Sequence, residues 1–443
     1  MTDLATTIRL TIRPGRSNQT FMLVSNRSFV LRHAGVLLAL LCIASCAPAP
    51  PNMSDAEIAA RLGPAAPLLP LYRALASLES GARTMPVVIL QIGDSHTAND
   101  SFSGRLRELF QARFGDAGRG VLPPGIPHRY YRPTRVSVTA QGWTVISSFR
   151  RESSGPFGIT GLRQHAAGAA EMTLSAPDSD DLDRTEIEVL NQPGGGTIDA
   201  EFDTGVRAAI ATAAPAGQSA WITLPFAPGS HTLTLRARSD GPVDLLAWSV
   251  TRGKSGVIYA NLGTIGASVD LLDRWDPTIV RQDLAHFSPA LIVLAFGTNE
   301  GFRDSTDPSQ YVTEFTARLR DLRAAVPTAG LLVLGPPDGD RHRGKRSAAA
   351  PACGNPDWAE PPRLAEVREA QRTAASHEGA YFWDWSAAMG GGCSMLRWAA
   401  TDPPLAAPDH VHLFAPGYQA TAEDLFRAIM DGYDRYRALR LTS

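Results

Sequence analysis

The chain has 443 residues, which is long enough for two domains or for one domain with a large insertion. Hydrophobic residues make up 44% and charged residues 19%, a globular composition, and 42 Lys and Arg against 44 Asp and Glu leave a net charge of −2. This balance argues against a nucleic-acid-binding protein, because phosphate binding needs a clustered basic excess. Four Cys residues are too few for a disulfide scaffold of this size.

The amino-terminal segment has the features of a secretion signal. Its apolar run, Ala34–Ile43, is far too short to cross a bilayer, which needs about 20 residues. The run ends in small residues before Cys46 and resembles a bacterial lipobox, in which that Cys carries lipid. A plain signal peptide cleaved near Ala47 is the alternative. We expect residues 1–46 to be a signal peptide with a lipobox and the mature protein to lie in the cell envelope, anchored to a membrane through Cys46 and facing the periplasm, or free in the periplasm.

Two further cysteines, Cys353 and Cys393, remain in the mature chain. Two thiols in an oxidising compartment usually form a bridge, so we expect a disulfide between them. Two unpaired thiols are the alternative, because spacing in the sequence does not show that they are close.

The mature chain opens with an expected tether and helical segment over residues 47–84. Val87–Ile92 is a nearly continuous apolar run, which is typical of a strand buried on both faces of a parallel sheet. Ser103–Phe114 has apolar residues on one helical face, and Gly115 fits the end of that helix. Strand, turn and helix in this order predict an α/β fold.

From about residue 120 to residue 252 the pattern changes to short alternating runs, such as Leu233, Leu235 and Ala237, separated by Gly and Pro clusters. This pattern predicts an antiparallel β-sandwich. Trp143 and Trp221 lie within it. Core packing is the default for both, and stacking on sugar rings is the alternative.

The α/β pattern then returns. We expect strands over Leu291–Phe296, Leu331–Leu334 and Tyr381–Trp385, and helices over Pro308–Val326, Leu364–Ser376 and Tyr418–Tyr433. The α/β domain is therefore expected in two parts, 85–119 and 257–443, with the inserted β-sandwich domain over 120–256. We expect the insertion to join at the end of the strands where the active site lies.

Candidate catalytic residues follow the first strand and lie near the carboxyl terminus. Ser95 sits where open α/β sheets bind ligands, beyond the carboxyl end of a strand. Asp409 and His412 are spaced to meet across one turn, which would give the serine a base and the base an orienting acid. His410 is the competing base, and we expect it to be a solvent-exposed loop residue. His96 is expected to shape the turn and line the pocket.

Two glycine turns fit an oxyanion hole. Gly266 lies in the segment Gly263–Ser268, where a backbone N–H can come close to a ligand. Asn299 follows the second buried strand, and its side-chain amide can donate to an oxyanion. Each turn alone is an ordinary glycine turn.

In this order, Ser95, Gly266, Asn299 and the Asp409/His412 pair resemble the four blocks of the SGNH (GDSL-type) hydrolases. The resemblance implies a flavodoxin-like three-layer α/β/α domain with a parallel sheet, and ester cleavage through an acyl-enzyme. Carried over, Ser95 is the nucleophile, His412 the general base and Asp409 its orienting acid. The N–H groups of Ser95 and Gly266 and the Asn299 side chain would form the oxyanion hole. The third block usually ends Asn-Asp, whereas here Glu300 follows Asn299.

Residues 92–120 and 256–268 more narrowly resemble bacterial peptidoglycan O-acetylesterases, in which a β-sandwich like a carbohydrate-binding module separates the first two blocks. The resemblance implies a serine esterase that removes O-acetyl groups from a cell-envelope polysaccharide, with no cofactor. The alternatives are an O-acetyltransferase acting on envelope glycan and a catalytically silent glycan-binding lipoprotein. A lipase is disfavoured, because the chain has no obvious apolar lid. No His/Cys cluster has metal-ligand spacing, so we predict no metal site.

Overall fold

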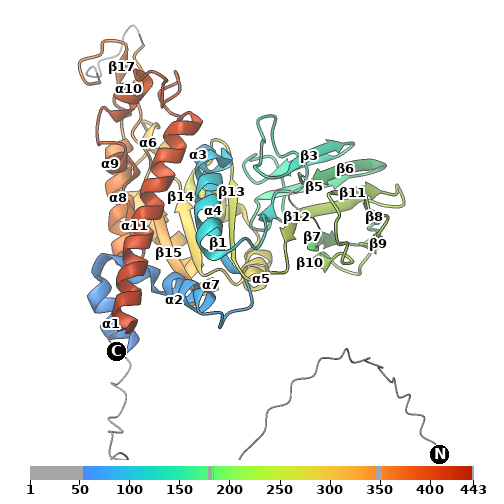
Figure 1. Ribbon diagram of the computed structural model, residues 1–443. Coiled ribbons are helices and arrows are strands. Elements are labelled where there is room, and N and C mark those ends of the chain that lie inside the picture. Colours follow the sequence, from blue (N-terminus) through green and yellow to red (C-terminus); the bar gives the residue numbers. More distant parts are fainter. Residues whose placement is uncertain (1–52, 178–181, 183, 345–351, 442–443) are drawn as a thin grey trace, which may run out of the picture. The chain divides into compact units, whose positions relative to one another are not determined.

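A five-stranded parallel sheet forms the centre of the α/β part of the chain (Figure 1). The computed structural model describes residues 53–177, 182, 184–344 and 352–441, so the expected signal, Cys46 and most of the tether lie outside the described residues. Across the sheet the strands are β13 (Val257–Gly263), β1 (Val87–Gly93), β14 (Leu291–Ala295), β15 (Gly330–Leu334) and β18 (Tyr381–Trp383). Numbered in chain order within this sheet, they run 2-1-3-4-5, the flavodoxin-like order. The predicted α/β class with a parallel sheet is confirmed.

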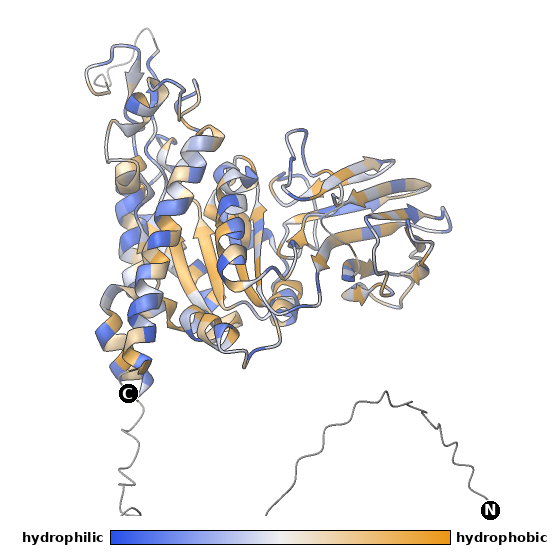
Figure 2. Ribbon diagram, in the orientation of Figure 1, coloured by the Kyte–Doolittle hydropathy of each residue, from blue (hydrophilic) through white to orange (hydrophobic). Residues whose placement is uncertain are grey.

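Helices cover both faces of this sheet, so its strands are apolar on both sides (Figure 2). Alternate residues such as Ile89 and Val293 face one layer, while Leu90 and Ile292 face the other. The first layer contains α2 (Leu69–Glu79), α4 (Asp100–Phe114) and α11 (Ala415–Leu441), and the second contains α5 (Pro277–Phe287), α7 (Pro308–Ala325) and α8 (Leu364–His377). Before them come α1 (Asp55–Leu62) and η1 (Gly63–Leu68), which form the expected lead-in helices. Among the described residues no helix is long and apolar enough to cross a membrane.

Sequence reasoning missed two elements that complete the α/β part. Strand β13 has the polar residue Asn261 in its middle, which interrupts the apolar run that marks a buried strand. Helix α5 is short, and only Ile279, Asp283 and Leu284 are buried on it, so its helical pattern is weak. Both lie between the β region and the second predicted strand.

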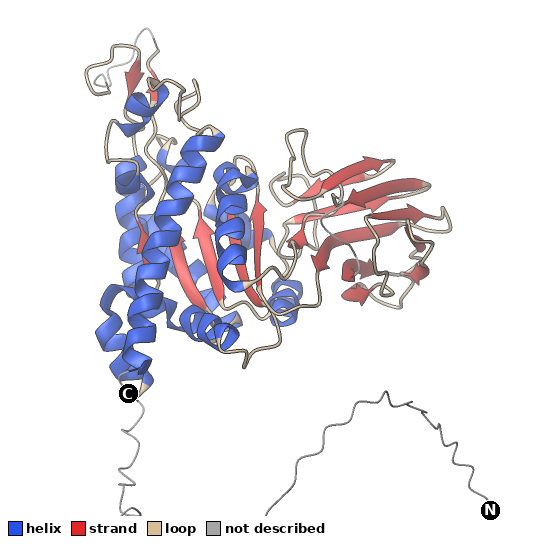
Figure 3. Cartoon of the chain, viewed as in Figure 1, coloured by secondary structure: helices blue, strands red, loops and turns tan. Residues whose placement is uncertain are grey.

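Residues 120–251, which we call the β region, form two antiparallel sheets (Figure 3). The strands of one sheet are β10 (Gln218–Thr223), β7 (Arg184–Asn191), β12 (Val243–Thr251), β5 (Leu162–Ala166) and β4 (Thr144–Ser147), and β2 (Gly120–Leu122) pairs with β12. The strands of the other sheet are β3 (Ser137–Gln141), β6 (Ala170–Ser175), β11 (Thr232–Ala237), β8 (Thr197–Phe202) and β9 (Arg207–Ala211). Buried side chains from both sheets, such as Trp248 and Leu235, share one apolar core.

Both tryptophans singled out in the β region take part in packing. Trp143 packs against the core between its two sheets. The indole of Trp221 donates to Asp283 of α5 at 3.0 Å and stacks on His286 at 4.8 Å between ring centroids. The packing role expected by default is therefore the one the structure shows.

The β region joins the α/β part at the amino ends of the strands, so the expectation that it joins at the active-site end is wrong. Helix α4 runs back along the sheet, and at its end Gly115 O accepts a hydrogen bond from Val257 N at 2.8 Å. Val257 pairs with Val87, the first residue of β1. The returning chain lies at the same end, where Arg252 N donates to Ala117 O at 2.9 Å. A helix that follows a strand of a parallel sheet returns the chain to the sheet's starting edge, and this reversal explains the error.

A buried cluster of charges holds the start of the β region against α4. Asp100 accepts hydrogen bonds from Arg107 and Arg119, each at 3.0 Å, and from the backbone N–H of Thr134 at 2.8 Å. Burial opposes the charge on Asp100, but the two guanidinium groups outweigh it and lower the pKa of that carboxyl. A charged group this deeply buried is stable only when it is paired in this way.

The expected disulfide between Cys353 and Cys393 is present, with 5.8 Å between the Cα atoms. It connects the segment after β15 to the turn before the short helix α10 (Ser394–Ala399). The disulfide prediction is confirmed.

Candidate active site

Ser95 lies directly beyond the carboxyl end of β1, as the first residue of the short helix α3 (Ser95–Ala98; Figure 1). Asp94 precedes it, and its side chain accepts the backbone N–H of His96 at 2.9 Å, which shapes the turn. A side chain on Gly93 would clash with Ala295 O of the neighbouring strand and with Thr97, so only glycine fits there. The turn thus brings the Ser95 hydroxyl to the edge of the sheet.

Three loops meet at this edge. In the register of the sheet Gly93 lies opposite both Gly263 and Ala295, so the loops that carry Gly266 and Asn299 start beside the loop of Ser95. In a 2-1-3-4-5 sheet the strand order reverses between the first and third strands, here β1 and β14, and ligands bind at that point. Sequence reasoning placed Ser95 and Asn299 after strands but missed β13, the strand before Gly266. The strand order brings all three loops together.

Asp409 shapes the loop that carries His412. Its Oδ1 accepts the backbone N–H groups of Val411 and His412, both at 3.0 Å, while its Oδ2 lies 2.7 Å from His412 Nδ1. Burial works to raise the pKa of Asp409, but the hydrogen bonds from His412 and the two backbone groups hold it well below its usual range. Asp409 is therefore an anion that orients the imidazole.

His412 Nε2 lies 2.9 Å from Ser95 Oγ, across 317 residues of sequence. With Nδ1–H donating to Asp409, a neutral His412 presents the free lone pair of Nε2 to the serine hydroxyl. The side chains of His412 and Asp409 have relative solvent exposures of 39% and 50%, so the site is open to solvent. The array can remove a proton from Ser95 and activate it as a nucleophile.

The loops that start beside the Ser95 loop carry free hydrogen-bond donors. Gly266 has a positive φ of 79°, and neither its N–H nor that of Ser95 donates to any acceptor in the described chain. The Asn299 amide donates one N–H to Ala267 O at 2.8 Å, which holds the side chain in place and leaves its second N–H for a ligand. Unused, preorganised donors of this kind stabilise a developing oxyanion.

Glu300 hydrogen-bonds to the segments that carry Gly266 and Asn299. Its Oε1 accepts Val269 N at 2.9 Å and its Oε2 accepts Gly297 N at 3.1 Å, so one carboxyl group joins the Gly266 loop to the Asn299 loop. Burial raises the pKa of Glu300 to about 7. Glu300, which stands where the family usually has Asp after Asn, thus supplies a carboxyl group that links the two loops.

His96 belongs to the turn after β1, but it is buried and so does not line an open pocket as expected. It is buried, its Nδ1 lies 2.9 Å from the Tyr418 hydroxyl, and its ring centroid is 5.2 Å from that of His412. Burial, together with the nearby His412, lowers the pKa of His96 to about 3. His96 is therefore neutral and packs against the base.

His410 differs from its expectation as a solvent-exposed loop residue. Its relative exposure is 8%, and its ring stacks on Trp358 with 3.7 Å between centroids. It points to Asp340, at 3.4 Å from Nδ1, and not to Ser95. The segment that contains Trp358 folds over it, and this contact is 52 residues away in sequence, so no local signal showed it. Within the described residues, no group of three or more His, Cys, Asp or Glu side chains is placed to hold a metal ion.

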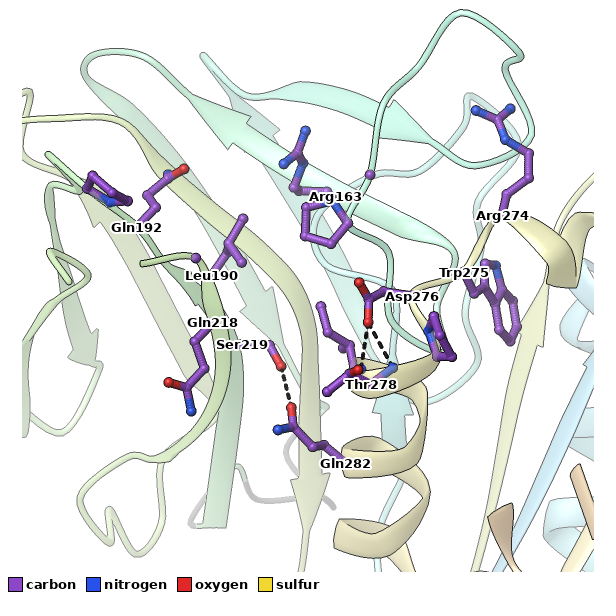
Figure 4. Close-up of a pocket in the computed structure, with 16 residues that line it drawn as sticks. Arg163, Leu190, Gln192, Gln218, Ser219, Arg274, Trp275, Asp276, Thr278 and Gln282 are labelled. Atoms are coloured by element: carbon purple, nitrogen blue, oxygen red, sulfur yellow. Dashed lines mark hydrogen bonds between the residues drawn. The ribbon is translucent and has the colours of Figure 1, made fainter. Parts of the chain in front are cut away.

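An open cleft of about 990 Å³ lies apart from Ser95, between the β region and α5 (Figure 4). Leu190 and Ile279 supply apolar surface, and Gln218, Ser219 and Gln282 supply polar groups. Ser219 Oγ donates to Gln282 Oε1 at 3.1 Å, which leaves the Gln282 NH₂ and the whole Gln218 amide for a ligand. We call this the Gln218 cleft.

Comparisons with known proteins show what the chain is similar to. Residues 229–420 match the GDSL-like lipase/acylhydrolase family, and this match does not include Ser95. A solved structure of a peptidoglycan O-acetylesterase is 27% identical, covers 82% of this chain and 96% of its own, and has a TM-score of 0.68. A family two carbohydrate esterase from Cellvibrio japonicus is 12% identical, and the match covers 68% of this chain and 99% of the esterase, with a TM-score of 0.26. An acetyl xylan esterase is 15% identical, and the match covers 39% of this chain and 81% of that esterase, with a TM-score of 0.28.

The two esterases with TM-scores of 0.26 and 0.28 superpose poorly on this chain. No curated protein matches the chain significantly. The family match, the likeness to the peptidoglycan O-acetylesterase and the α/β sheet agree with one another. The chain carries a GDSL-like acylhydrolase domain of the SGNH type, resembles the peptidoglycan O-acetylesterases, and is a carboxylic ester hydrolase.

Proposed function

We propose that this esterase removes O-acetyl groups from peptidoglycan through an acyl-enzyme formed on Ser95. The observation that carries the proposal is the continuous array Ser95, His412 and Asp409, with contacts of 2.9 and 2.7 Å. It occurs in a chain that is similar over 82% of its length to a peptidoglycan O-acetylesterase.

In the first half-reaction Ser95 Oγ attacks the acetyl carbonyl carbon, and its proton passes to His412 Nε2. The negative Asp409 stabilises the resulting imidazolium. The carbonyl oxygen becomes an oxyanion, which the N–H groups of Ser95 and Gly266 and the Asn299 amide stabilise. The bond between the acetyl carbon and the sugar oxygen then breaks, and His412 returns the proton to that oxygen. The products are a free sugar hydroxyl and acetyl-Ser95.

In the second half-reaction water attacks acetyl-Ser95 and gives its proton to His412. The tetrahedral intermediate collapses, acetate leaves, and the proton returns to Ser95 Oγ. A sugar hydroxyl in place of water would give the O-acetyltransferase, through the same acyl-enzyme.

We propose further that the β region is an inserted β-sandwich domain that helps to hold the polymer. Its support is the Gln218 cleft, whose side-chain amides lie beside apolar surface. Sugars present hydroxyl groups at the ring edge and C–H groups on the ring face, and a surface of this mixed kind complements both. The proposed location is the cell envelope, through lipid on Cys46, which lies outside the described residues.

The test is acetate release by purified protein from O-acetylated peptidoglycan, with O-acetylated xylan and a long-chain ester in parallel. We expect the wild-type protein to release acetate fastest from peptidoglycan. The Ser95→Ala variant should keep only the low residual activity that substrate binding and the oxyanion hole provide. Faster release from xylan or from the long-chain ester would overturn the substrate. Acetyl transfer to an added glycan without acetate release would favour the transferase, and acetylated peptidoglycan left intact by a protein that binds it would favour the silent binding protein.

A further inference from the structure

Three of the exposed apolar side chains lie in or against segments that carry candidate site residues. The seven large hydrophobic side chains that are exposed in the described chain are Met85, Tyr130, Phe149, Phe226, Ile265, Phe414 and Leu441. Of these, Ile265 precedes Gly266 and Phe414 follows His412 by two residues. Phe149, which is 47% exposed, touches Gly266 from the β region.

Phe149 lies directly over the oxyanion loop. A Cβ built on Gly266 would lie 3.2 Å from the Cζ atom of Phe149, so the edge of the ring covers the position that a side chain would take. The contact links residues 117 positions apart in the sequence, from two different parts of the fold. Phe149 therefore stands beside the N–H that receives the oxyanion in the proposed mechanism.

The loop of Phe149 is held firmly, although it is on the surface. Arg274, at the end of the short helix η2 (Val269–Arg274) that follows the Gly266 loop, donates to Arg150 O at 2.6 Å and to Ser153 O at 2.5 Å. Next to it, Trp275 Nε1 donates to Ser148 Oγ at 3.3 Å. These contacts hydrogen-bond the Phe149 loop to the segment that follows Gly266.

From this geometry we infer that Phe149 is a specificity-determining residue, whose ring stacks on the sugar that bears the acetyl group. In an acetate ester only the carbonyl carbon and the ester oxygen lie between the carbonyl oxygen and the sugar. A carbonyl oxygen at Gly266 N therefore brings the sugar ring close to Phe149. The C–H face of a pyranose is apolar and packs well on an aromatic ring. A ring that stays half exposed suits a group that continues into a polymer, whereas a pocket for the acetyl methyl alone would be closed.

This inference rests on the proposed deacetylation and names a contact within it. Stacking on the sugar acts on glycan substrates and not on esters that lack a sugar. Phe149→Ala should raise the KM for O-acetylated peptidoglycan fragments about tenfold, while the kinetics on ethyl acetate stay within about twofold of wild type. Phe149→Tyr keeps the ring and should restore the KM for the glycan.

The matched control is Phe226→Ala, which removes another exposed ring of the β region, one that is 58% exposed and lies against Arg184 instead of Gly266. It should leave both substrates unchanged. Arg274 is a positioning residue, so Arg274→Ala should raise the KM for the glycan by a similar factor. The double variant Arg274→Ala with Phe149→Ala should have a KM for the glycan no higher than that of either single variant. Each substitution removes the same contact, that of the Phe149 ring with the sugar.

Three results would overturn the inference. The first is equal loss of Phe149→Ala activity on the glycan and on ethyl acetate, which would make the ring a support of the oxyanion loop. The second is an unchanged KM for the glycan, and the third is an equal effect of Phe226→Ala. Failure of the proposed function looks different, because the wild-type protein would then hydrolyse ethyl acetate but release no acetate from peptidoglycan, and the inference would fall with it.

Discussion

Asp409 holds His412 at two points: one carboxylate oxygen accepts the backbone N–H of His412 at 3.0 Å, and the other lies 2.7 Å from its imidazole Nδ1. The same side chain thus sets the turn of the loop and the direction of the ring. Both contacts are local, and the ring of His96, distant in sequence, packs against the same imidazole. The position of Ser95 opposite it depends entirely on the sheet.

The two neighbouring histidines should respond differently to replacement. His412→Ala should lower the rate of ester hydrolysis by several orders of magnitude, as much as Ser95→Ala, because both remove a member of one catalytic unit. His410→Ala should keep activity but lower the midpoint of thermal unfolding, because it removes a buried ring that packs on Trp358. Steady-state kinetics and thermal unfolding of both variants check this, and the opposite ranking would assign the base to His410.

Asn299→Ala should lower kcat by roughly 10²–10³ and leave KM nearly unchanged, because one oxyanion donor acts mainly in the transition state. Its side chain also donates to Ala267 O, so the variant loosens the neighbouring loop. Asn299→Asp provides the control, since it keeps the size of the side chain but puts a negative charge at the oxyanion. A loss confined to KM in the Ala variant would contradict the donor role.

Glu300 should give the fold a measurable pH dependence. Burial raises its pKa from 4.5 to about 7, so the folded state binds this proton more tightly than the unfolded chain does. Its contribution to the free energy of unfolding is therefore complete below pH 4.5 and is lost as the pH rises through about 7, by about 3 kcal/mol. Glu300→Gln removes this titration. Urea unfolding of both proteins between about pH 4 and pH 8 measures the difference in stability, and a difference that is constant with pH would contradict the assignment.

Replacing Gln218 should weaken the binding of polymer without affecting the chemistry. Gln218→Ala with Gln282→Ala removes the free amide groups of the cleft, so KM for polymeric O-acetylated peptidoglycan should rise severalfold while hydrolysis of ethyl acetate is unchanged. Gln310→Ala, an exposed glutamine of α7 that bonds to Glu314 outside the cleft, is the matched control. Equal loss on both substrates would mean that the cleft supports the fold and does not hold the polymer.

Cys46→Ser should abolish lipidation and release the protein from the membrane fraction. The expectation comes from the small residues before Cys46 at the end of an apolar run. Mass spectrometry of the mature amino terminus, with fractionation of the envelope, measures both effects. An unmodified terminus beyond Cys46 would end the lipoprotein interpretation and leave the plain signal peptide.

Much of the candidate site could be predicted because its signals are local. A residue that follows a buried strand of a parallel sheet lies at the carboxyl edge wherever that strand sits, so the sequence predicts Ser95 and Asn299 at one edge without the strand order. Asp409 and His412 were paired from their spacing alone. Cys353 and Cys393 were paired from the compartment and the count of thiols.

The class of the fold, the order of the four site blocks and the chemistry that these residue types allow can all be predicted from the sequence, because each follows from neighbours in the chain. The attachment of the β region, the burial of His410 and the contact of Phe149 with the Gly266 loop are visible only in the folded protein. The attachment depends on the direction in which α4 returns along the sheet. The other two are contacts between segments 52 and 117 residues apart, and such contacts arise from packing, which no local pattern of residues records.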